Sequence, residues 1–523
     1  MRTRHLSFVL SSIPCVLLAA TGCNDDTSNS SNGSTATETG LPTGDGDGDN
    51  ETSDSNSGDG DGDPTTTGDG DGDPTTTGDG DGDPTTTGDG DGDPTTTGDG
   101  DGDPTTTGDG DGDPPDPICG NAILEVGEAC DDGDQIDNNY CSNSCTIVPC
   151  DQQVGGGNQE FDFTYIWVSN TPAGTVSKID TATLVEEGRY RTDPNSNASP
   201  SRTAVNVNGR YAAVANRTAN TVTVFAADEQ YCIDKNNNGM IETSTGANDV
   251  LAWNADECML WSITLNPSNG GANNRGPRPL GWDFADQDPV TCEWQTHNLW
   301  LGWYPDGQTG YFWYVNGETG ELIQEVTVPN WGGNNWGPYG GAVDSQHNFW
   351  VSGWHGPLVR INADFTYDKW DSPLFETHDS YGMALDAEGH PWIGGCSGQV
   401  LTFDPVTEQV STVGADTGGC LRGLMVDAED RAWIAGNNSC RLVEVDTVTN
   451  TVINPNIPIP GCSTPVGISI DVDGYVWIVD QNGTAYKMDP DTYQIVDSYS
   501  GLSSPYTYSD MTGGGIALQV NPQ

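Results

Sequence analysis

Oxygen-bearing side chains alternate along one short stretch of the chain, residues 234–242. Gly239 stands where such a loop has to turn, and a backbone carbonyl can add a further oxygen. Oxygen donors at this spacing on a tight loop suit a hard cation such as Ca²⁺. The sequence therefore predicts a structural Ca²⁺ site here, and a polar Asn/Gly turn without metal is the alternative. The expected ligands are Asp234, Asn236, Asn238, the carbonyl of Met240, and Glu242.

The same stretch resembles the first nine positions of an EF-hand loop. That resemblance implies a bidentate glutamate at the twelfth position, where this chain has Thr245, so Asp249 or another carboxylate would have to substitute. No flanking EF-hand helices are evident. The loop belongs to an insertion over about residues 228–258, which a Cys232–Cys258 disulfide is expected to close.

Aromatic, amide and basic side chains gather in the Gly-rich loops of the C-terminal half. Such side chains on loops over a rigid scaffold stack on sugar rings or hold an extended peptide. We therefore predict a binding site for an extracellular glycan, peptide or protein, with loop packing as the alternative for the tryptophans. The candidate ligand-binding residues are Trp331, Trp336, Trp354, His355, His378, Arg422, Asn437 and Asn438.

Two histidines and one acid are the only candidates for catalysis in these loops. His355 and His378 fall in loops of neighbouring repeats, and Asp480 lies in an equivalent loop. Such groups could serve as a general base or as metal ligands. The alternative is that each histidine is only a hydrogen-bonded loop residue.

Charge and missing motifs exclude several function classes. Residues 151–523 hold 45 acidic and 15 basic residues, a net charge of about −30. Such a surface repels nucleic acids and anionic lipid headgroups, and no basic stripe counters it. We find no phosphate-binding Gly loop, no nucleophile elbow and no His-rich metal spacing.

A repeat of about forty residues organises the elements that carry these loops. Trp350, Trp392, Trp433 and Trp477 follow one another at spacings of 42, 41 and 44 residues. In each unit an apolar run ends in Asp, a turn follows, and the tryptophan marks the next strand. Units of this length made only of strands and turns are typical of propeller blades, with the tryptophan packing between neighbouring sheets.

Weaker copies upstream bring the number of blades to seven. Residues 166–168, 211–214 and 299–301 hold the position of the second strand, and the long gap between the last two is one blade with an insertion. The expected fold is therefore an all-β, seven-bladed β-propeller over residues 160–523. We expect residues 516–520 to form a C-terminal strand beside residues 165–168 that closes the ring and removes an open edge.

Cysteine positions support this arrangement. Of 14 cysteines, Cys15 lies in the N-terminal signal and Cys23 just after it, which leaves an even number for pairing. Loops between second and third strands share a face of the ring with loops before first strands. The expected bridges are Cys396–Cys420 and Cys440–Cys462, with Cys150 and Cys292 left unassigned.

The N-terminal residues 1–22 resemble a bacterial lipoprotein signal. Arg2 and Arg4 precede an apolar run, residues 6–18, and Cys23 follows. The resemblance implies lipidation of Cys23 and anchoring to the outer membrane or cell surface of a Gram-negative bacterium, with membrane contact through the lipid only. An ordinary secretory signal is the alternative.

The next part, residues 23–118, is predicted to be a disordered acidic tether. Residues 24–118 contain 27 acidic residues and no Lys or Arg, and the unit GDGDGDPTTT repeats five times from residue 58 to 107. Such a composition buries too little apolar surface to offset the entropy of folding. Weak Ca²⁺ binding by the Gly-Asp runs and O-glycosylation of the threonines remain open.

A compact cysteine-rich module is predicted over residues 119–150. Its Cys-Gly-Asn, Gly-Glu-Ala-Cys-Asp-Asp-Gly and Cys-Ser-Asn-Ser-Cys segments closely resemble the myxobacterial-type cysteine-rich repeat. The resemblance implies a disulfide-stapled surface module, and a Zn²⁺ site is the alternative. The cysteines concerned are Cys119, Cys130, Cys141 and Cys145.

The blades themselves resemble those of virginiamycin B lyase (streptogramin lyase) and NHL-like propellers over roughly residues 160–520. The resemblance implies a Mg²⁺-dependent elimination that opens a cyclic peptide lactone, with His and Glu on the top loops. At the implied His positions this chain has Tyr339, Tyr381, Leu421 and Val466. At the implied Glu positions it has Gly353, Gly395 and Gly436, and only Asp480 is acidic. We therefore expect a non-catalytic binding module, with the lyase and a structural envelope protein as alternatives.

Overall fold

The structure is a computed structural model. It describes residues 118–137, 139–150, 164–265, 275–284, 288, 290, 292, 297–333, 336–414, 419–437 and 439–520. The predicted signal, Cys23, nearly all of the tether and Asn438 lie outside these residues.

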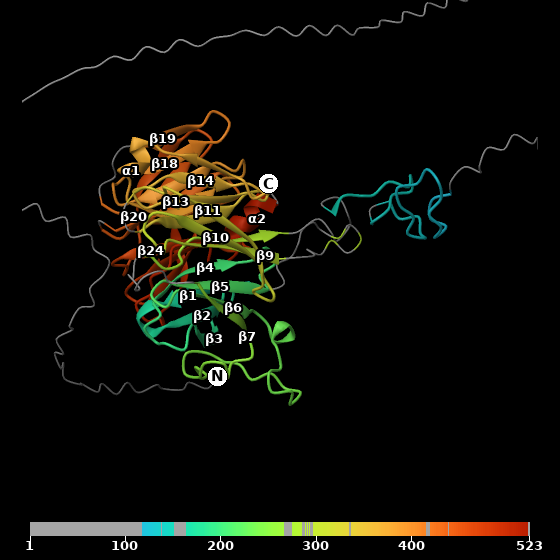
Figure 1. Ribbon diagram of the computed structural model, residues 1–523, viewed down its shortest axis with the longest axis horizontal. Helices are drawn as coiled ribbons and strands as arrows, with labels where there is room; N and C mark the ends of the chain where they lie inside the picture. Colours follow the sequence, from blue (N-terminus) through green and yellow to red (C-terminus); the bar gives the residue numbers. More distant parts are fainter. Residues whose placement is uncertain are drawn as a thin grey trace, which may run out of the picture. The chain divides into compact units, whose positions relative to one another are not determined.

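Seven antiparallel sheets follow one another from residue 164 onward, so the predicted seven-bladed β-propeller is confirmed (Figure 1). Six sheets have four strands and one has three, and within each sheet every strand pairs with its neighbours in the chain. The short helices are η2 (Thr171–Ala173), η3 (Glu229–Tyr231), α1 (Pro373–Glu376) and α2 (Gly514–Val520).

The strands have the following bounds. The first three sheets contain β1 (Tyr165–Asn170), β2 (Thr175–Asp180) and β3 (Glu186–Arg191); β4 (Pro200–Val205), β5 (Tyr211–Asn216), β6 (Thr221–Ala226) and β7 (Met259–Thr264); β8 (Leu280–Phe284), β9 (His297–Trp303), β10 (Gly310–Asn316) and β11 (Leu322–Val328). The next two contain β12 (Pro338–Val343), β13 (Phe349–Gly353), β14 (Leu358–Ile361) and β15 (Tyr367–Trp370); β16 (Ser380–Leu385), β17 (Pro391–Gly395), β18 (Val400–Asp404) and β19 (Gln409–Val413). The last two contain β20 (Leu421–Val426), β21 (Arg431–Gly436), β22 (Arg441–Asp446) and β23 (Thr451–Pro458); β24 (Pro465–Ile470), β25 (Val476–Asp480), β26 (Thr484–Asp489) and β27 (Gln494–Tyr499).

The first strands of the sheets surround a central channel. Strands β4, β8, β12, β16 and β20 each lie beside the first strand of the next sheet. Their residues are almost all buried, because both faces of each strand meet protein. Fourth strands such as β11 and β27 are largely exposed. The core therefore lies between sheets and around the channel, as the propeller pattern requires.

The repeating Asp and Trp form one buried hydrogen bond in each of four blades. The four tryptophans are at most 1% exposed, and each indole Nε1 donates to the carboxylate six residues earlier at 2.8–2.9 Å. The same carboxylates also accept backbone N–H groups of the intervening turn. This fixes the turn and satisfies the indole at the same time, so the packing interpretation of the tryptophans is correct. The pairs are Trp350–Asp344, Trp392–Asp386, Trp433–Asp427 and Trp477–Asp471.

The expected C-terminal strand is wrong in its residues and its conformation. Residues 514–520 form helix α2, and the ring is instead closed by an irregular segment, residues 506–512, which we call the closing segment. Trp167 N donates to Met511 O at 2.9 Å, and Tyr506 N donates to Ser169 O at 3.3 Å. The closing segment therefore occupies the first-strand position beside β1, although it does not form a regular strand.

The closing segment also joins the two neighbouring blades. On the β24 side, Thr512 Oγ1 donates to Ile470 O at 2.5 Å. On the β4 side, Thr203 N donates to Ser509 Oγ at 3.0 Å, and Ser509 Oγ donates to Thr203 O at 2.5 Å. Polar side chains thus provide the hydrogen bonds that a ladder would otherwise supply.

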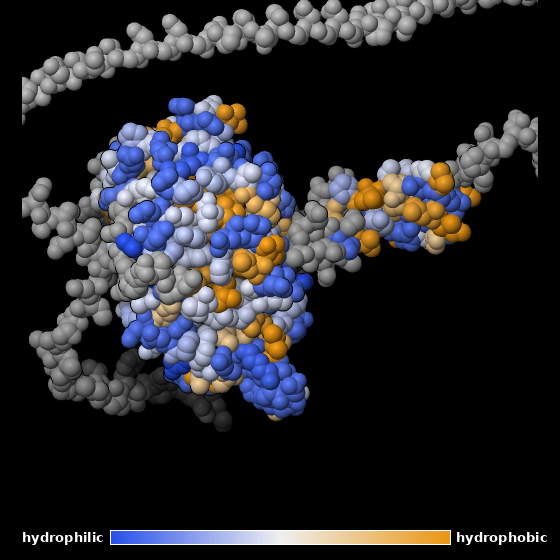
Figure 2. All heavy atoms as spheres, in the orientation of Figure 1, coloured by the Kyte–Doolittle hydropathy of each residue, from blue (hydrophilic) through white to orange (hydrophobic). Residues whose placement is uncertain are grey.

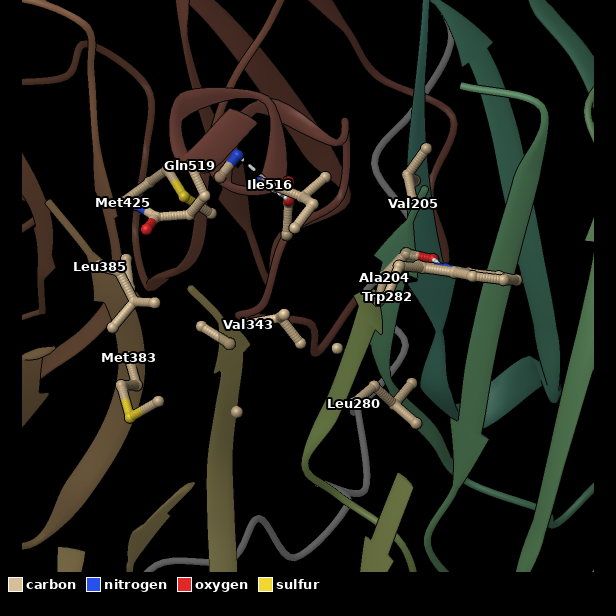
Figure 3. Close-up of a pocket in the computed structure, with 16 residues that line it drawn as sticks. Ala204, Val205, Leu280, Trp282, Val343, Met383, Leu385, Met425, Ile516 and Gln519 are labelled. Carbon is tan, nitrogen blue, oxygen red and sulfur yellow. Dashed lines mark hydrogen bonds between the residues drawn. The ribbon is translucent and has the colours of Figure 1, made fainter. Parts of the chain in front are cut away.

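Helix α2 lies against one end of the channel (Figure 3). Its first turn is held by Asp510, whose carboxylate accepts the backbone N–H groups of Gly513, Gly515 and Ile516. Gln519 is 2% exposed and donates from Nε2 to Asp386 O at 2.7 Å. Between α2 and the first strands lies a cavity of about 40 Å³, lined mainly by apolar side chains such as Leu280 and Val343.

Six disulfides link the described cysteines. The three bridges expected in the propeller are present: Cys396–Cys420, Cys440–Cys462 and Cys232–Cys258. Cys150 pairs with Cys292 across 142 positions of the chain. Within the cysteine-rich module the bridges are Cys119–Cys145 and Cys130–Cys141, so the expected disulfide framework is confirmed there as well.

This number of disulfides indicates a protein exported to an oxidising compartment. Within the described ranges, every helix is too short or too polar to cross a bilayer. On the face shown in Figure 2, hydrophobic residues of the propeller form small separate groups among polar ones.

Candidate functional site

Tyrosine and arginine side chains converge where the first strands begin, at the end of the channel opposite α2. Tyr339 and Tyr381 lie near the starts of β12 and β16, and the ring centroid of Tyr508 is 5.9 and 5.3 Å from theirs. The Tyr508 hydroxyl lies 2.8 Å from that of Tyr339, and the Tyr506 hydroxyl lies 3.3 Å from that of Tyr381. We call this group the channel mouth; it consists of Arg202, Tyr339, Tyr381, Arg422, Tyr506 and Tyr508.

Arg202 reaches across the channel from β4. Its Nη1 donates to Tyr508 O at 3.1 Å, and its Nη2 donates to Tyr381 O at 3.0 Å. The guanidinium carbon lies 3.6 Å from the ring centroid of Tyr508, so the cation faces the electron-rich ring. The side chain is 1% exposed. The side chain of Arg202 therefore links opposite sides of the ring through hydrogen bonds.

Three tyrosines of the channel mouth, Tyr339, Tyr381 and Tyr506, stay protonated. Burial raises the pKa of Tyr339, of Tyr381 and of Tyr506 above that of an ordinary tyrosine. Their hydroxyls are consequently neutral hydrogen-bonding groups and do not neutralise the arginines. Burial lowers the pKa of Arg202, and the nearby Arg278 lowers it further. An arginine nevertheless keeps its charge at neutral pH because its reference pKa exceeds 12.

Two predicted ligand-binding tryptophans border the channel mouth. Trp354 is 7% exposed and packs against Tyr339 and Tyr381, with ring centroids 4.9 and 4.8 Å apart. Trp336 is partly exposed and lies 6.1 Å from Trp354. His355 stacks on Trp354, and its Nε2 is hydrogen-bonded to the Asp379 carboxylate. The structure therefore places Trp336, Trp354 and His355 next to one another, and their role in ligand binding stays a prediction.

His378 has a structural place in the same region. It is 2% exposed, and its Nε2 donates to Gln399 O at 3.0 Å. A Cβ at Gly395 would lie 2.3 Å from the His378 Cε1, so only glycine leaves room for this imidazole. Burial lowers the pKa of His378, which keeps the ring neutral at pH 7.

The other predicted site residues are not part of the channel mouth. Trp331 is fully buried in the core beside Phe312, at 5.7 Å between ring centroids. Asn437 accepts the Cys420 N–H at 3.1 Å and so holds the loop before β20. Asp480 is fully buried, and its carboxylate accepts three backbone N–H groups and one hydroxyl.

The predicted Ca²⁺ loop brings its side chains together. The amide Nδ2 atoms of Asn236 and Asn238 donate to the two carboxylate oxygens of Glu242, at 2.9 and 2.7 Å. The Asp234 carboxylate accepts the Gly239 N–H at 2.8 Å. The Oδ1 atoms of Asn236 and Asn238 accept the backbone N–H groups of Asn238 and Met240, at 3.0 and 2.8 Å, so both amides would have to turn their oxygens toward Glu242 to complete a donor set for a hard cation. The Thr245 hydroxyl donates to Asp249 at 3.0 Å. The Ca²⁺ site stays a prediction.

Titration calorimetry with Ca²⁺ should show one ion bound in this loop per chain. Thermal unfolding in the presence of Ca²⁺ should give a higher Tm. Because the ion binds only the folded loop, it should stabilise the protein by about 2.7 kcal/mol at one hundred times its Kd. Asp234→Ala should abolish both effects, since it removes the first carboxylate of the loop. Asp364→Ala, in a turn of another blade, is the control and should change neither. If Ca²⁺ produces neither binding heat nor a change in Tm, the predicted Ca²⁺ site is wrong.

Comparisons with known proteins leave the family open. No family model matches the sequence, and no curated protein does. A solved structure of catalytically inactive virginiamycin B lyase from Staphylococcus aureus with quinupristin is 14% identical, covering 61% of this chain and 92% of that one, with a TM-score of 0.42. Apo AztD from Citrobacter koseri is 11% identical, covering 66% and 96%, with a TM-score of 0.41. A functionally unknown protein from Desulfotomaculum acetoxidans is 9% identical, covering 66% and 98%, with a TM-score of 0.43. At these values no activity is assigned from them.

Proposed function

We propose that the protein is an exported lipoprotein whose propeller binds an extracellular ligand, a glycan or a peptide, at the channel mouth without changing it chemically. The observation that carries this proposal is the cluster of aromatic rings and arginines at one end of the channel. The tyrosines of this cluster are at most 6% exposed, so the contact area for a ligand comes from the partly exposed Trp336 and His355 beside them, and aromatic rings supply such area at a small entropic cost. Lipidation at Cys23 would keep the module at the cell surface.

The surroundings of the site support binding more than catalysis. His378 and Asp480 are engaged by the protein itself, and both are almost fully buried. The disulfide Cys396–Cys420 packs against the same cluster of residues as the tyrosines. The site is thus rigid, as preorganised binding sites are.

A lyase is the second candidate, because His355 is partly exposed and hydrogen-bonded to Asp379 beside Trp354. A base oriented by a carboxylate is what a proton-abstracting enzyme needs. The residues do not fit the Mg²⁺ that the lyase resemblance implies, however. Gly353 and Gly395 stand where carboxylates would be required, and His378 fills the space next to Gly395. We therefore derive no Mg²⁺-dependent step.

Trp336→Ala is expected to weaken ligand binding by about tenfold or more, because an aromatic anchor beside the site is lost. The measurement is binding of the full chain to an array of glycans and peptides, followed by titration of each saturable ligand. Trp313→Ala is the matched control, since Trp313 lies on β10 and donates to Glu325.

The outcomes separate the three functions. Unchanged binding of every ligand by the Trp336→Ala variant would contradict the proposed site. Conversion of a streptogramin B lactone that stops with His355→Ala would establish the lyase instead. Absence of any saturable ligand on the array would favour a purely structural envelope protein.

A further inference from the structure

The two arginines of the channel mouth are paired differently from three arginines elsewhere in the propeller. Arg189, Arg360 and Arg431 each meet a carboxylate, at 2.6, 2.8 and 2.8 Å. Arg202 and Arg422 have no such partner among the residues that the structure describes. This contrast is notable because acids outnumber bases 45 to 15 in residues 151–523. Carboxylates are abundant in the chain but stay away from these two arginines.

Arg202 is a buried cation with incomplete compensation. Two carbonyls and the face of Tyr508 offset part of its desolvation, but within the described residues its Nε has no hydrogen-bond acceptor. Removing a charge from water without a counterion is costly. Arg278 adds a second positive charge nearby, which lowers the pKa of Arg202 further. An anion at this place would relieve both the repulsion and the missing acceptor.

Arg422 converges on the same tyrosines from β20. Its guanidinium carbon lies 5.4 Å from the ring centroid of Tyr381 and 5.8 Å from that of Tyr506. Its Nε and Nη1 lack acceptors in the described part of the chain. Arg202 bonds the carbonyl of Tyr381, so both arginines contact this one residue. The two guanidinium groups therefore both lie around Tyr381.

We propose that the group bound at the channel mouth is the carboxylate of an acidic sugar, a uronate residue of an extracellular glycan. This inference rests on the proposed binding function and specifies its ligand. A guanidinium matches a carboxylate because N–H groups of one plane meet two coplanar oxygens. Of the two, Arg422 is the arginine with two nitrogens that lack acceptors among the described residues, Nε and Nη1, whereas both Nη atoms of Arg202 bond carbonyls and only its Nε is left. Trp354 packs on Tyr381, the residue that both arginines contact, and Trp336 lies 6.1 Å from Trp354 and faces Arg278, so these tryptophans supply faces on which a sugar ring can stack. A peptide offers a carboxylate as well, but its body is not a flat ring.

The test compares each uronate oligosaccharide with its methyl ester, which keeps the sugar and removes the charge. Galacturonate, glucuronate and mannuronate trimers and their esters are titrated into the full chain at two salt concentrations. At least one acid should bind about 10- to 100-fold more tightly than its ester, because hydrogen bonds between charged groups are lost in the ester. The preference should shrink at high salt.

Substitutions of the two arginines show whether they produce the preference for the acid over its ester. Arg422→Gln should weaken binding of the acid about 10- to 100-fold more than binding of the ester, so the preference disappears. Arg360→Gln is the matched control, because Arg360 pairs with Asp368 on β14 and β15, away from the channel. Unchanged melting of both variants shows that they are folded. Arg202→Lys, which keeps the charge but not the fork, should reduce the preference without abolishing it.

Each of three other outcomes would contradict a specific part of the proposal: the carboxylate, the sugar or the binding function. Equal affinity for every acid and its ester, with neutral glycans still bound through Trp336, refutes the carboxylate inference and leaves the proposed function standing. Binding of a peptide through its terminal carboxylate in preference to all uronates refutes the sugar. Absence of any saturable glycan or peptide refutes the proposed function together with the inference.

Discussion

Truncation after Ser500 is expected to abolish cooperative folding of the propeller. The deletion removes the closing segment, whose buried residues Tyr506, Tyr508 and Met511 are at most 6% exposed. Burial of three such side chains contributes about 1.5–3 kcal/mol each, while a whole domain is stable by only about 5–15 kcal/mol. The deletion also leaves the edge of β1 unpaired. Urea unfolding followed by tryptophan fluorescence and far-UV circular dichroism is the measurement.

A shorter truncation is the control for this experiment. Deletion of residues 513–523 removes α2 but keeps the closing segment. It should lower the midpoint of unfolding through the loss of buried Ile516 and Leu518, yet leave one cooperative transition. If the chain cut after Ser500 unfolds at the same urea concentration as the full chain, the closing segment does not hold the ring together.

Asp427→Ala should destabilise the protein by about 3–5 kcal/mol, because it leaves buried donors without an acceptor and breaks a buried ion pair. Asp427 is 3% exposed and accepts from Arg431 Nε and Trp433 Nε1, both at 2.8 Å. It also accepts the backbone N–H of Arg431 at 2.9 Å. Chemical denaturation of the variant and of the parent chain gives the difference in the free energy of unfolding.

Asp404→Ala provides the comparison for the aspartate substitution. Asp404 caps an exposed turn of the neighbouring blade, where it accepts the N–H groups of Val406 and Thr407. Its loss should cost about 1 kcal/mol, since water replaces it as acceptor. Similar losses of unfolding free energy for the two variants would show that the buried Asp–Trp pair stabilises the protein no more than an exposed turn does.

The architecture could be predicted because it rests on periodic local signals. The spacing of Trp350, Trp392, Trp433 and Trp477 reports the blade length directly, and a blade needs neighbours to bury both faces. The pairing of Cys396 with Cys420 followed from loop equivalence once the blades were aligned. Each of these inferences uses geometry that repeats along the chain.

The ring closure could not be predicted in the same way. Residues 515–520 alternate like a strand, but Asp510 accepts three N–H groups at the start of this stretch and stabilises a helix instead. The closing segment forms no regular ladder, because its own side chains make part of its hydrogen bonds: the Ser509 hydroxyl bonds the backbone N–H and C=O of Thr203. Tertiary contacts therefore decide both conformations.

The candidate site was found in part. Trp354, His355 and Arg422 lie in loops or strand starts that the repeat pattern places on one face. Arg202, Tyr506 and Tyr508 were missed, because Arg202 lies in a blade whose repeat has drifted and the tyrosines lie in the closing segment. A signal was present nonetheless: Tyr339, Tyr381 and Arg422 occupy equivalent positions at the starts of three first strands.

The Cys150–Cys292 bridge determines where a mechanical load enters the propeller. A pull on the chain before residue 150 passes through the sulfur atoms to the connection between β8 and β9, and it bypasses β1. Strand β1 belongs to the one three-stranded sheet and would be the first to peel away if it carried that tension itself. The disulfide therefore transmits force from the N-terminal side to a complete blade, and the contact between β1 and the closing segment carries no load.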